Sequence, residues 1–160
     1  MRITPDMLVK LYRLPLLEEA IEPLGEKEIV VRRAFPVEKR AVSKWVGEHF
    51  TDNWACEAEN SFAANPPNIH IAVRGETILG FACYETTFRN YFGPTGVDES
   101  ERRTGIGRAL LLSGLYVLRD MGYRYAIIGY AGVPDYYEKA IGAVAIDNDP
   151  RSGSYGGMIV

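Results

Sequence analysis

Apolar residues recur at helical spacing in the stretch from residue 106 to residue 121. Spacings of i, i+4, i+8, i+11, i+12 and i+15 place them on one face, which predicts an amphipathic helix. Gly122 follows and fits the C-terminal cap, because a left-handed backbone conformation costs glycine little. The predicted buried face consists of Ile106, Leu110, Gly114, Val117, Leu118 and Met121.

Short apolar runs bounded by turn residues predict the strands of a sheet. Five such runs occupy 28–34, 69–73, 77–84, 91–98 and 125–129. Because strand, long helix and strand follow one another over 91–129, the two strands of this unit are expected to be parallel. A closing antiparallel pair is expected at 143–146 and 155–160.

Further helical segments are expected at 36–46, 53–64 and 135–141. Pro36 begins the first, Asp52 is the expected N-cap of the second, and Gly142 ends the third. Residues 1–27 are expected to form a helical extension that begins at Thr4 and has an apolar stripe over its first turns. This extension either packs on the surface of the domain or serves as a docking arm or a homodimer contact.

These elements predict a single α+β domain over residues 1–160. Its core would be a mixed sheet of six or seven strands, flanked by about four helices. With 47% hydrophobic and 24% charged residues, the composition is that of an ordinary globular protein. A chain of 160 residues is long enough to bury one sizeable core.

Charge and cysteine content narrow the classes of partner. The net charge of −3 offers no basic field for nucleic acid, and no apolar run reaches the length of a membrane span. The N-terminus lacks a signal-peptide pattern, so a cytoplasmic protein is expected. Cys56 and Cys83 are not spaced as a disulfide framework or zinc site, and His49 and His70 suggest no metal site.

A polar, glycine-containing loop joins the strand ending at Val97 to the long helix. Its sequence, Arg-Arg-Thr-Gly-Ile-Gly-Arg-Ala over 102–109, places three arginines around the unpaired N–H groups of a helix start, which predicts a pyrophosphate site. The Walker pattern is excluded because Gly107 is followed by arginine and alanine. The dinucleotide fingerprint is excluded because Leu110 stands where a third glycine is required.

The remaining pattern, Arg-x-x-Gly-x-Gly after a strand, resembles the acetyl-coenzyme A loop of the GNAT superfamily of N-acetyltransferases. Arg102, Gly105 and Gly107 fill its defining positions. A second stretch, Asp-Tyr-Tyr-Glu-Lys-Ala-Ile-Gly-Ala over 135–143, resembles a signature near the C-terminus of the same family. The loop before it departs from the family pattern, because Tyr130 and Val133 replace a common asparagine and alanine.

The resemblance implies a GNAT-like fold and direct attack of a primary amine on acetyl-coenzyme A, with no metal. It implies that the pyrophosphate is bound by Arg102, Arg103, Thr104, Gly105, Ile106, Gly107 and Arg108. The thioester would be oriented by Thr95, Gly96 and Val97, where glycines in a strand also suggest a bulge. Tyr137, with Tyr136 as the adjacent alternative, would protonate the leaving thiolate.

Glu85 is the candidate base for the amine proton, with Asp98, Glu99 or water as alternatives. Both Glu85 and Tyr137 also have a purely structural interpretation, as a strand-end charge and as a packing residue. Glu57 and Glu59 are interpreted as part of a solvated helix face.

The acceptor is expected to be a small molecule. The aromatic residues near the presumed cleft favour this, although their helical spacing fits core packing as well. They are Trp45, Phe50, Trp54 and Phe62. Two other functions remain open at this point: a non-catalytic acyl-coenzyme A sensor or partner-binding module, and an acetyltransferase acting on protein lysines or N-termini.

Overall fold

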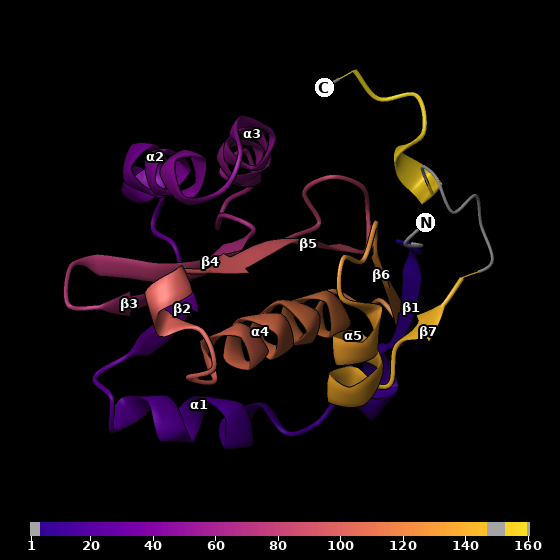
Figure 1. Cartoon of the computed structure of the whole chain (residues 1–160), viewed down its shortest axis with the longest axis horizontal. Helices are drawn as coiled ribbons and strands as arrows, with labels where there is room; N and C mark the ends of the chain where they lie inside the picture. Colours follow the sequence, from indigo (N-terminus) through magenta and orange to yellow (C-terminus); the bar gives the residue numbers. More distant parts are fainter. Residues whose placement is uncertain (1–3, 147–152, 160) are drawn as a thin grey trace.

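A seven-stranded mixed sheet forms the centre of the computed structural model, which describes residues 4–146 and 153–159 (Figure 1). The strands in spatial order are β2 (Val30–Arg33), β3 (Ile69–Arg74), β4 (Thr77–Tyr84), β5 (Tyr91–Val97), β6 (Tyr125–Ile128), β1 (Met7–Lys10) and β7 (Val144–Ala145). The helices are α1 (Leu17–Gly25), α2 (Lys39–His49), α3 (Asp52–Ser61), α4 (Ile106–Asp120) and α5 (Pro134–Ile141). The predicted α+β class and mixed sheet are confirmed.

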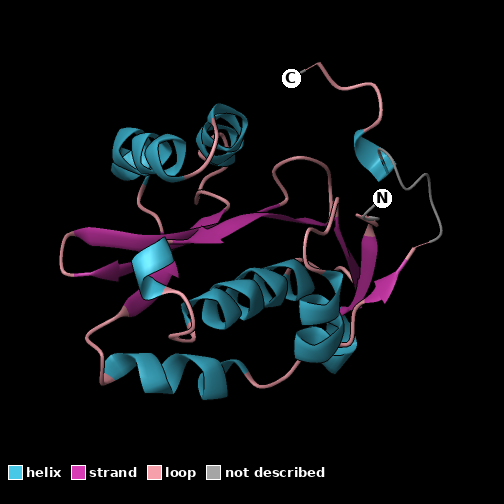
Figure 2. Ribbon diagram, in the orientation of Figure 1, coloured by secondary structure: helices cyan, strands magenta, loops and turns pink. Residues whose placement is uncertain are grey.

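The helices form a layer on each face of the sheet, as Figures 1 and 2 show. α1, α4 and α5 cover one face, and α2 and α3 cover the other. Each face has its own apolar cluster, one around α4 and one beneath α2 and α3. The side chain of Phe81 in β4 belongs to the second cluster, whereas the neighbouring Ala82 belongs to the first, as strand alternation requires.

α4 is buried over more of its circumference than a single helical face. Gly122 has a φ of 103°, which confirms the predicted left-handed cap. Leu111, Leu112 and Leu115 are also buried, although they lie outside the predicted face. α1 packs against α4 on the side away from the sheet, so the helix is enclosed from both directions. Met121, predicted to be buried, is 45% exposed.

The prediction of a helix at the start of the chain is wrong. Met7–Lys10 forms β1, which lies inside the sheet and pairs antiparallel with both β6 and β7. The sequence misled because Met7, Leu8 and Leu11 are apolar at helical spacings, whereas burial alternates with the period of a strand. The later part of the predicted helical extension is confirmed as a helix, α1.

Asp6, just before β1, is a buried carboxylate that connects three parts of the chain. Its side chain is 4% exposed in the protein and accepts hydrogen bonds from the backbone amides of Tyr130, at 2.8 Å, and Ser154, at 2.9 Å. Its backbone carbonyl accepts from the amide of Ile146 at 2.8 Å. The loop after β6 and the C-terminal residues are therefore held to the start of the chain.

The predicted C-terminal strand pair is also wrong. β7 pairs with β1, and Gly153–Tyr155 forms a 3₁₀ helix instead of a strand. β7 is the edge strand of the sheet, and β1 is its neighbour in the strand order. Residues 147–152 and residue 160 lie outside the described residues.

The other boundaries lie within three residues of those predicted: α2 ends at His49 instead of residue 46, and α3 ends at Ser61 instead of residue 64. One cap also differs. Thr51, not Asp52, is the N-cap of α3, since its hydroxyl accepts from the Trp54 amide at 3.1 Å. In the described part of the chain, no helix is long and apolar enough to cross a membrane. The same residues include no group of three or more His, Cys, Asp or Glu side chains placed to hold a metal ion.

We predict that Gly114→Val destabilises the protein, because α4 and β5 meet at this glycine. A Cβ atom there would lie 2.7 Å from Phe92 Cε2 and 3.0 Å from Tyr84 Cδ1. Overpacking of this kind costs about 1–3 kcal/mol of unfolding free energy, measurable by urea denaturation. Gly25→Val is the matched control, because nothing lies within 4 Å of its Cβ position. Equal stability of the two variants would contradict the prediction.

Candidate functional site

The loop before α4 ends in a helix start that is exposed to solvent. Gly105 is the N-cap and has a φ of 93°, a conformation that favours glycine. The first backbone bond of the helix runs from the amide of Ala109 to the carbonyl of Gly105, at 3.1 Å. The amides of the residues before Ala109 therefore have no acceptor within the helix, and their partial positive charge makes an anion site.

Three arginines surround this helix start without a carboxylate partner. Arg102 and Arg103 are exposed and Arg108 is half-buried. Within the described part of the chain their guanidinium groups make no ion pair, whereas Arg74 pairs with a glutamate at 2.7 Å. Positive charge that the protein itself leaves unneutralised at a helix N-terminus is suited to bind a phosphate group.

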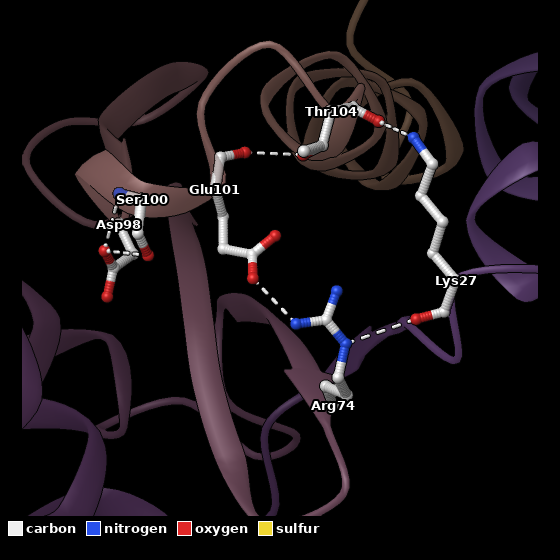
Figure 3. Close-up of polar contacts among 6 residues, drawn as sticks. All are labelled: Lys27, Arg74, Asp98, Ser100, Glu101 and Thr104. Carbon is white, nitrogen blue, oxygen red and sulfur yellow. Dashed lines mark hydrogen bonds and ion pairs between the residues drawn. The ribbon is translucent and has the colours of Figure 1, made fainter.

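A closed ring of hydrogen bonds holds the loop in shape (Figure 3). Lys27 Nζ donates to the carbonyl of Thr104 at 3.0 Å, and Thr104 Oγ1 donates to the carbonyl of Glu101 at 2.5 Å. Arg74 Nη1 donates to Glu101 Oε1 at 2.7 Å, and its Nε donates to the carbonyl of Lys27 at 3.2 Å. Thr104, predicted as a phosphate ligand, thus also anchors the loop.

Asp98 fixes the entry to the same loop. Its Oδ1 accepts from the backbone amide and the hydroxyl of Ser100, each at 2.9 Å (Figure 3). These two hydrogen bonds are the main reason that the pKa of Asp98 lies below its usual range. His49 Nε2 lies 3.3 Å from its other oxygen. Asp98 and the neighbouring Glu99 are therefore parts of the loop. Neither residue lines the cavity of about 780 Å³ beside α3.

β5 contains the irregularity that its glycines suggested. Its pairing with β4 shifts register between the pairs Ala82–Thr95 and Tyr84–Phe92, so β5 has one extra residue there. Thr95 Oγ1 donates to the carbonyl of Phe81 at 3.0 Å. Gly96 is covered by the Phe50 ring, which a Cβ atom would overlap.

The parallel strands β5 and β6 separate after two residue pairs. Tyr91 pairs with Ile127 and Phe92 with Ile128, which confirms the predicted direction, and β5 then continues to Val97 without β6. A cavity of about 780 Å³ opens where they part. Its lining comes from α3, the loop after β4, residues Phe92, Gly93 and Pro94 of β5, the loop after β6, and Tyr155, Met158 and Ile159.

Thr95, Gly96 and Val97 lie between the two halves of the site. They follow the β5 residues that line the cavity and are not among those lining residues themselves. A Cβ on Gly107 would lie 3.7 Å from Val97 Cγ2, so the end of β5 touches the first turn of α4. β5 therefore leads from the cavity to the anion site.

α5 brings two tyrosines to the same region. The ring of Tyr137 is buried in the α4 cluster, and burial, with a smaller effect of Tyr136, raises its pKa to about 12. Its hydroxyl has no hydrogen-bond partner among the residues that the structure describes. Tyr136 is 40% exposed. Partial burial of its phenol raises its pKa, and the positive charge of Arg108 lowers it by a smaller amount. The start of α5 therefore lies close to the arginines of the anion site.

Glu85 has a structural position away from the cavity lining. Its Oε1 accepts from the Tyr123 hydroxyl at 2.5 Å, and its Oε2 accepts from the Asn90 amide at 2.7 Å. With a φ of 57°, it begins the loop between β4 and β5. The structure therefore places Tyr136, whose ring contacts Tyr137, near Arg108. The Glu85 carboxylate is bonded to Tyr123 and Asn90, at the start of the loop whose Thr87 lines the cavity.

Sequence reasoning missed Glu57, Lys27 and Arg74. Glu57 lines the cavity beside Trp54, whereas Glu59 is exposed and lies 3.6 Å from Lys39. The helical spacing of Trp54 and Glu57 was the available signal, since residues three apart share a face. Lys27 and Arg74 carry no local signal, because their partners are distant in sequence.

Trp54 and Phe50 differ in their relation to the cavity, although both were expected near the cleft. Trp54 lines it, while Phe50 packs on Gly96. Trp45 and Phe62 pack against the apolar cluster beneath α2 and α3 and do not line the cavity.

Comparison with known proteins gives one family match. The model of the family described as "Acetyltransferase (GNAT) family" matches residues 35–143. Comparison with curated protein sequences gives no match.

Solved structures share the fold. A GCN5-related glucosamine N-acetyltransferase region of a fungal multi-domain GH3 beta-N-acetylglucosaminidase matches 91% of this chain and 20% of its own, with 12% identity and a TM-score of 0.73. The match to a GCN5-related N-acetyltransferase from Sphaerobacter thermophilus covers 91% of this chain and 50% of that protein, with 24% identity and a TM-score of 0.67. The match to YhbS of Escherichia coli, a GNAT family N-acetyltransferase in complex with CoA, covers 71% of this chain and 67% of that protein, with 19% identity and a TM-score of 0.54.

The chain thus spans about a fifth of the length of the fungal protein and about half of the length of the Sphaerobacter thermophilus protein. At such identities the likeness concerns the fold alone.

We predict that Tyr137 remains protonated well above pH 10. Its folded-state pKa of about 12 exceeds the value of about 10 for tyrosine in an unfolded chain. The wild type should therefore lose unfolding free energy relative to Tyr137→Phe as pH rises from about 10 to 12, and not below that range. The ionisation of Tyr137 is measured as the difference in tyrosinate absorbance between the native wild type and native Tyr137→Phe over this pH range. Denaturant-unfolded samples of both proteins are the control. A Tyr137 signal near pH 10 in the native state would contradict it.

Proposed function

The chain belongs to the GNAT family of acetyltransferases, and from this premise we propose that it transfers the acetyl group of acetyl-coenzyme A to the primary amine of a small molecule. The observation that carries the proposal is the helix start at Gly105, with three arginines that have no carboxylate partner in the described chain. It lies at one end of β5, and the cavity opens at the other. A phosphate-bearing donor and an acceptor would meet along this strand.

The pyrophosphate of the coenzyme would be bound by the amides of the first turn of α4 and by Arg102, Arg103 and Arg108. Each guanidinium can donate two parallel hydrogen bonds to phosphate oxygens, and the helix N-terminus adds its own partial charge. The ring of hydrogen bonds through Lys27 and Arg74 keeps this loop in place before any ligand binds. A preformed site saves the ordering cost of binding.

The thioester would lie where β5 and β6 separate. Backbone groups of β5 from the bulge onward, including Thr95, Gly96 and Val97, no longer pair with β6 and are available to the pantetheine arm. Acetyl-coenzyme A supplies the activated acetyl group, whose carbonyl carbon the amine attacks as the bond to sulfur breaks. The residues of this chain orient the two reactants, a contribution that accounts for much of the rate in reactions of two bound molecules.

Tyr137 is the proposed proton donor to the departing thiolate, and Tyr136 is the alternative. With a pKa of about 12, Tyr137 carries its proton at neutral pH and can donate it or a hydrogen bond as negative charge develops on sulfur. Its hydroxyl is not committed to another described residue. The proton of the amine would leave through water, because the carboxylate of Glu85 is occupied by Tyr123 and Asn90.

The shape of the cavity favours a small acceptor over a protein chain. α3 lines it, and C-terminal residues Tyr155, Met158 and Ile159 line it as well. In Figure 1 the C-terminal segment 153–159, drawn in yellow, lies on the same side of the sheet as α2 and α3. A site lined by two such segments accommodates a compact molecule more readily than an extended polypeptide.

Binding of acetyl-coenzyme A is expected to depend on the absence of negative charge at residue 105. Isothermal titration of Gly105→Asp and Gly105→Asn separates charge from shape, because the two side chains have nearly the same size and both tolerate positive φ. We expect the aspartate to weaken binding at least about 100-fold and the asparagine by less than about tenfold. Equal losses would indicate a steric effect, and no binding to the wild type would refute the donor.

Removal of the Tyr137 hydroxyl is expected to slow the chemical step. In steady-state acetyl transfer, Tyr137→Phe should lower kcat about 100-fold, as loss of a general acid does, with little change in KM for acetyl-coenzyme A. Tyr136→Phe is the matched variant and should retain most of the activity. The reverse pattern would assign the role to Tyr136. Coenzyme binding without transfer to any amine would instead favour a non-catalytic sensor.

A further inference from the structure

The large cavity contains a single charged side chain among the described residues that line it. Glu57 of α3 is that residue. The others are aromatic, aliphatic, glycine or neutral polar residues, and none is basic. A ligand with a negative group would find no cation in this cavity, and a ligand with two positive groups would find one carboxylate for both.

Glu57 is held in a defined position. Thr87 Oγ1 donates to its Oε2 at 2.5 Å. Thr87 lines the same cavity, as does Tyr155. The other carboxylate oxygen, Oε1, accepts no hydrogen bond from any residue that the structure describes. One oxygen is thus fixed by the protein, and the other is free for a ligand.

The rest of the lining suits the carbon skeleton of an amine. Trp54, Phe92, Tyr130 and Tyr155 contribute aromatic rings to the cavity. Aromatic faces attract ammonium groups and provide apolar contact area for the carbon atoms attached to them. A carboxylate beside such rings is the combination expected for a cation with an apolar body.

We propose that Glu57 binds the ammonium group of the acceptor, and that the acceptor is a small monocation in which one primary ammonium is joined to an apolar or aromatic skeleton. This inference rests on the proposed function, because it identifies the cavity as the acceptor site of that reaction. Thr87 acts through Glu57 by fixing its carboxylate. Glu57 therefore selects acceptors by charge.

Binding of an amine without turnover tests the inference. The protein is saturated with coenzyme A, which has no acetyl group to transfer, and 2-phenylethylammonium is titrated calorimetrically into the wild type, Glu57→Gln and Glu59→Gln. Loss of a charged hydrogen-bond partner should weaken binding about 10- to 100-fold in Glu57→Gln. Glu59→Gln removes the same charge two residues away, outside the cavity lining, and should bind as the wild type does. Thermal melting of both variants checks the fold.

Two matched ligand pairs test charge selection on the unmodified protein. Phenylalanine adds a carboxylate to 2-phenylethylammonium and should bind at least about tenfold more weakly, because it brings a second negative charge near Glu57. Butane-1,4-diammonium adds a second ammonium to butylammonium and should gain no affinity. Equal binding of phenylalanine, stronger binding of the diammonium, or unchanged binding in Glu57→Gln would overturn the inference.

The same ligands distinguish this inference from the proposed function. Glu57-dependent ammonium binding without acetyl transfer would support the cation site and refute the catalytic proposal. Acetyl transfer whose KM for the amine is the same in Glu57→Gln and the wild type would support the catalytic proposal and refute the role of Glu57.

Discussion

β5 is held to β6 by two residue pairs, and the arrangement of the site depends on where that pairing stops. The strand that leaves β6 stays paired to β4 and rests on α4, where Gly114 allows the Phe92 ring to approach the helix closely. It therefore cannot collapse back and close the gap. The bulge in β5 lies at the point of separation, as bulges often do next to functional sites. The cavity and the anion site are consequently fixed relative to each other by one strand and one helix.

The charged residues around the loop divide into two groups with different tasks. Lys27 and Arg74 satisfy backbone and carboxylate oxygens and give the loop its shape. Arg102 and Arg103 make no such bonds in the described chain and point their charge into solvent. Exposed ion pairs contribute little to stability, so the ring serves geometry more than stability. Because Lys27 and Arg74 already hold the loop in shape, Arg102 and Arg103 are not needed for its structure.

Sequence reasoning succeeded where a local signal determines structure and failed where distant partners decide it. Gly122 and Gly142 have the left-handed conformations that their positions at helix C-termini suggested. The parallel β5–β6 unit follows from strand, helix and strand in succession. β1 was missed because four residues contain too few repeats to separate strand from helix. Glu57 was missed because its spacing from Trp54 places both on one helical face but does not show that this face meets the C-terminal residues.

β1 also determines the order in which this protein can be completed. Its neighbours in the sheet are β6 and β7, and Asp6 beside it bonds to amides 124 and 148 residues further along the chain. During synthesis these residues precede all of their partners, so the segment must wait, unpaired, until the rest of the sheet exists. Contacts of such high sequence separation slow folding more than they weaken the final structure. β1, the first strand of the sheet to be translated, is thus the last to be paired, and the site beside it matures only after β6 and β7 have been synthesised.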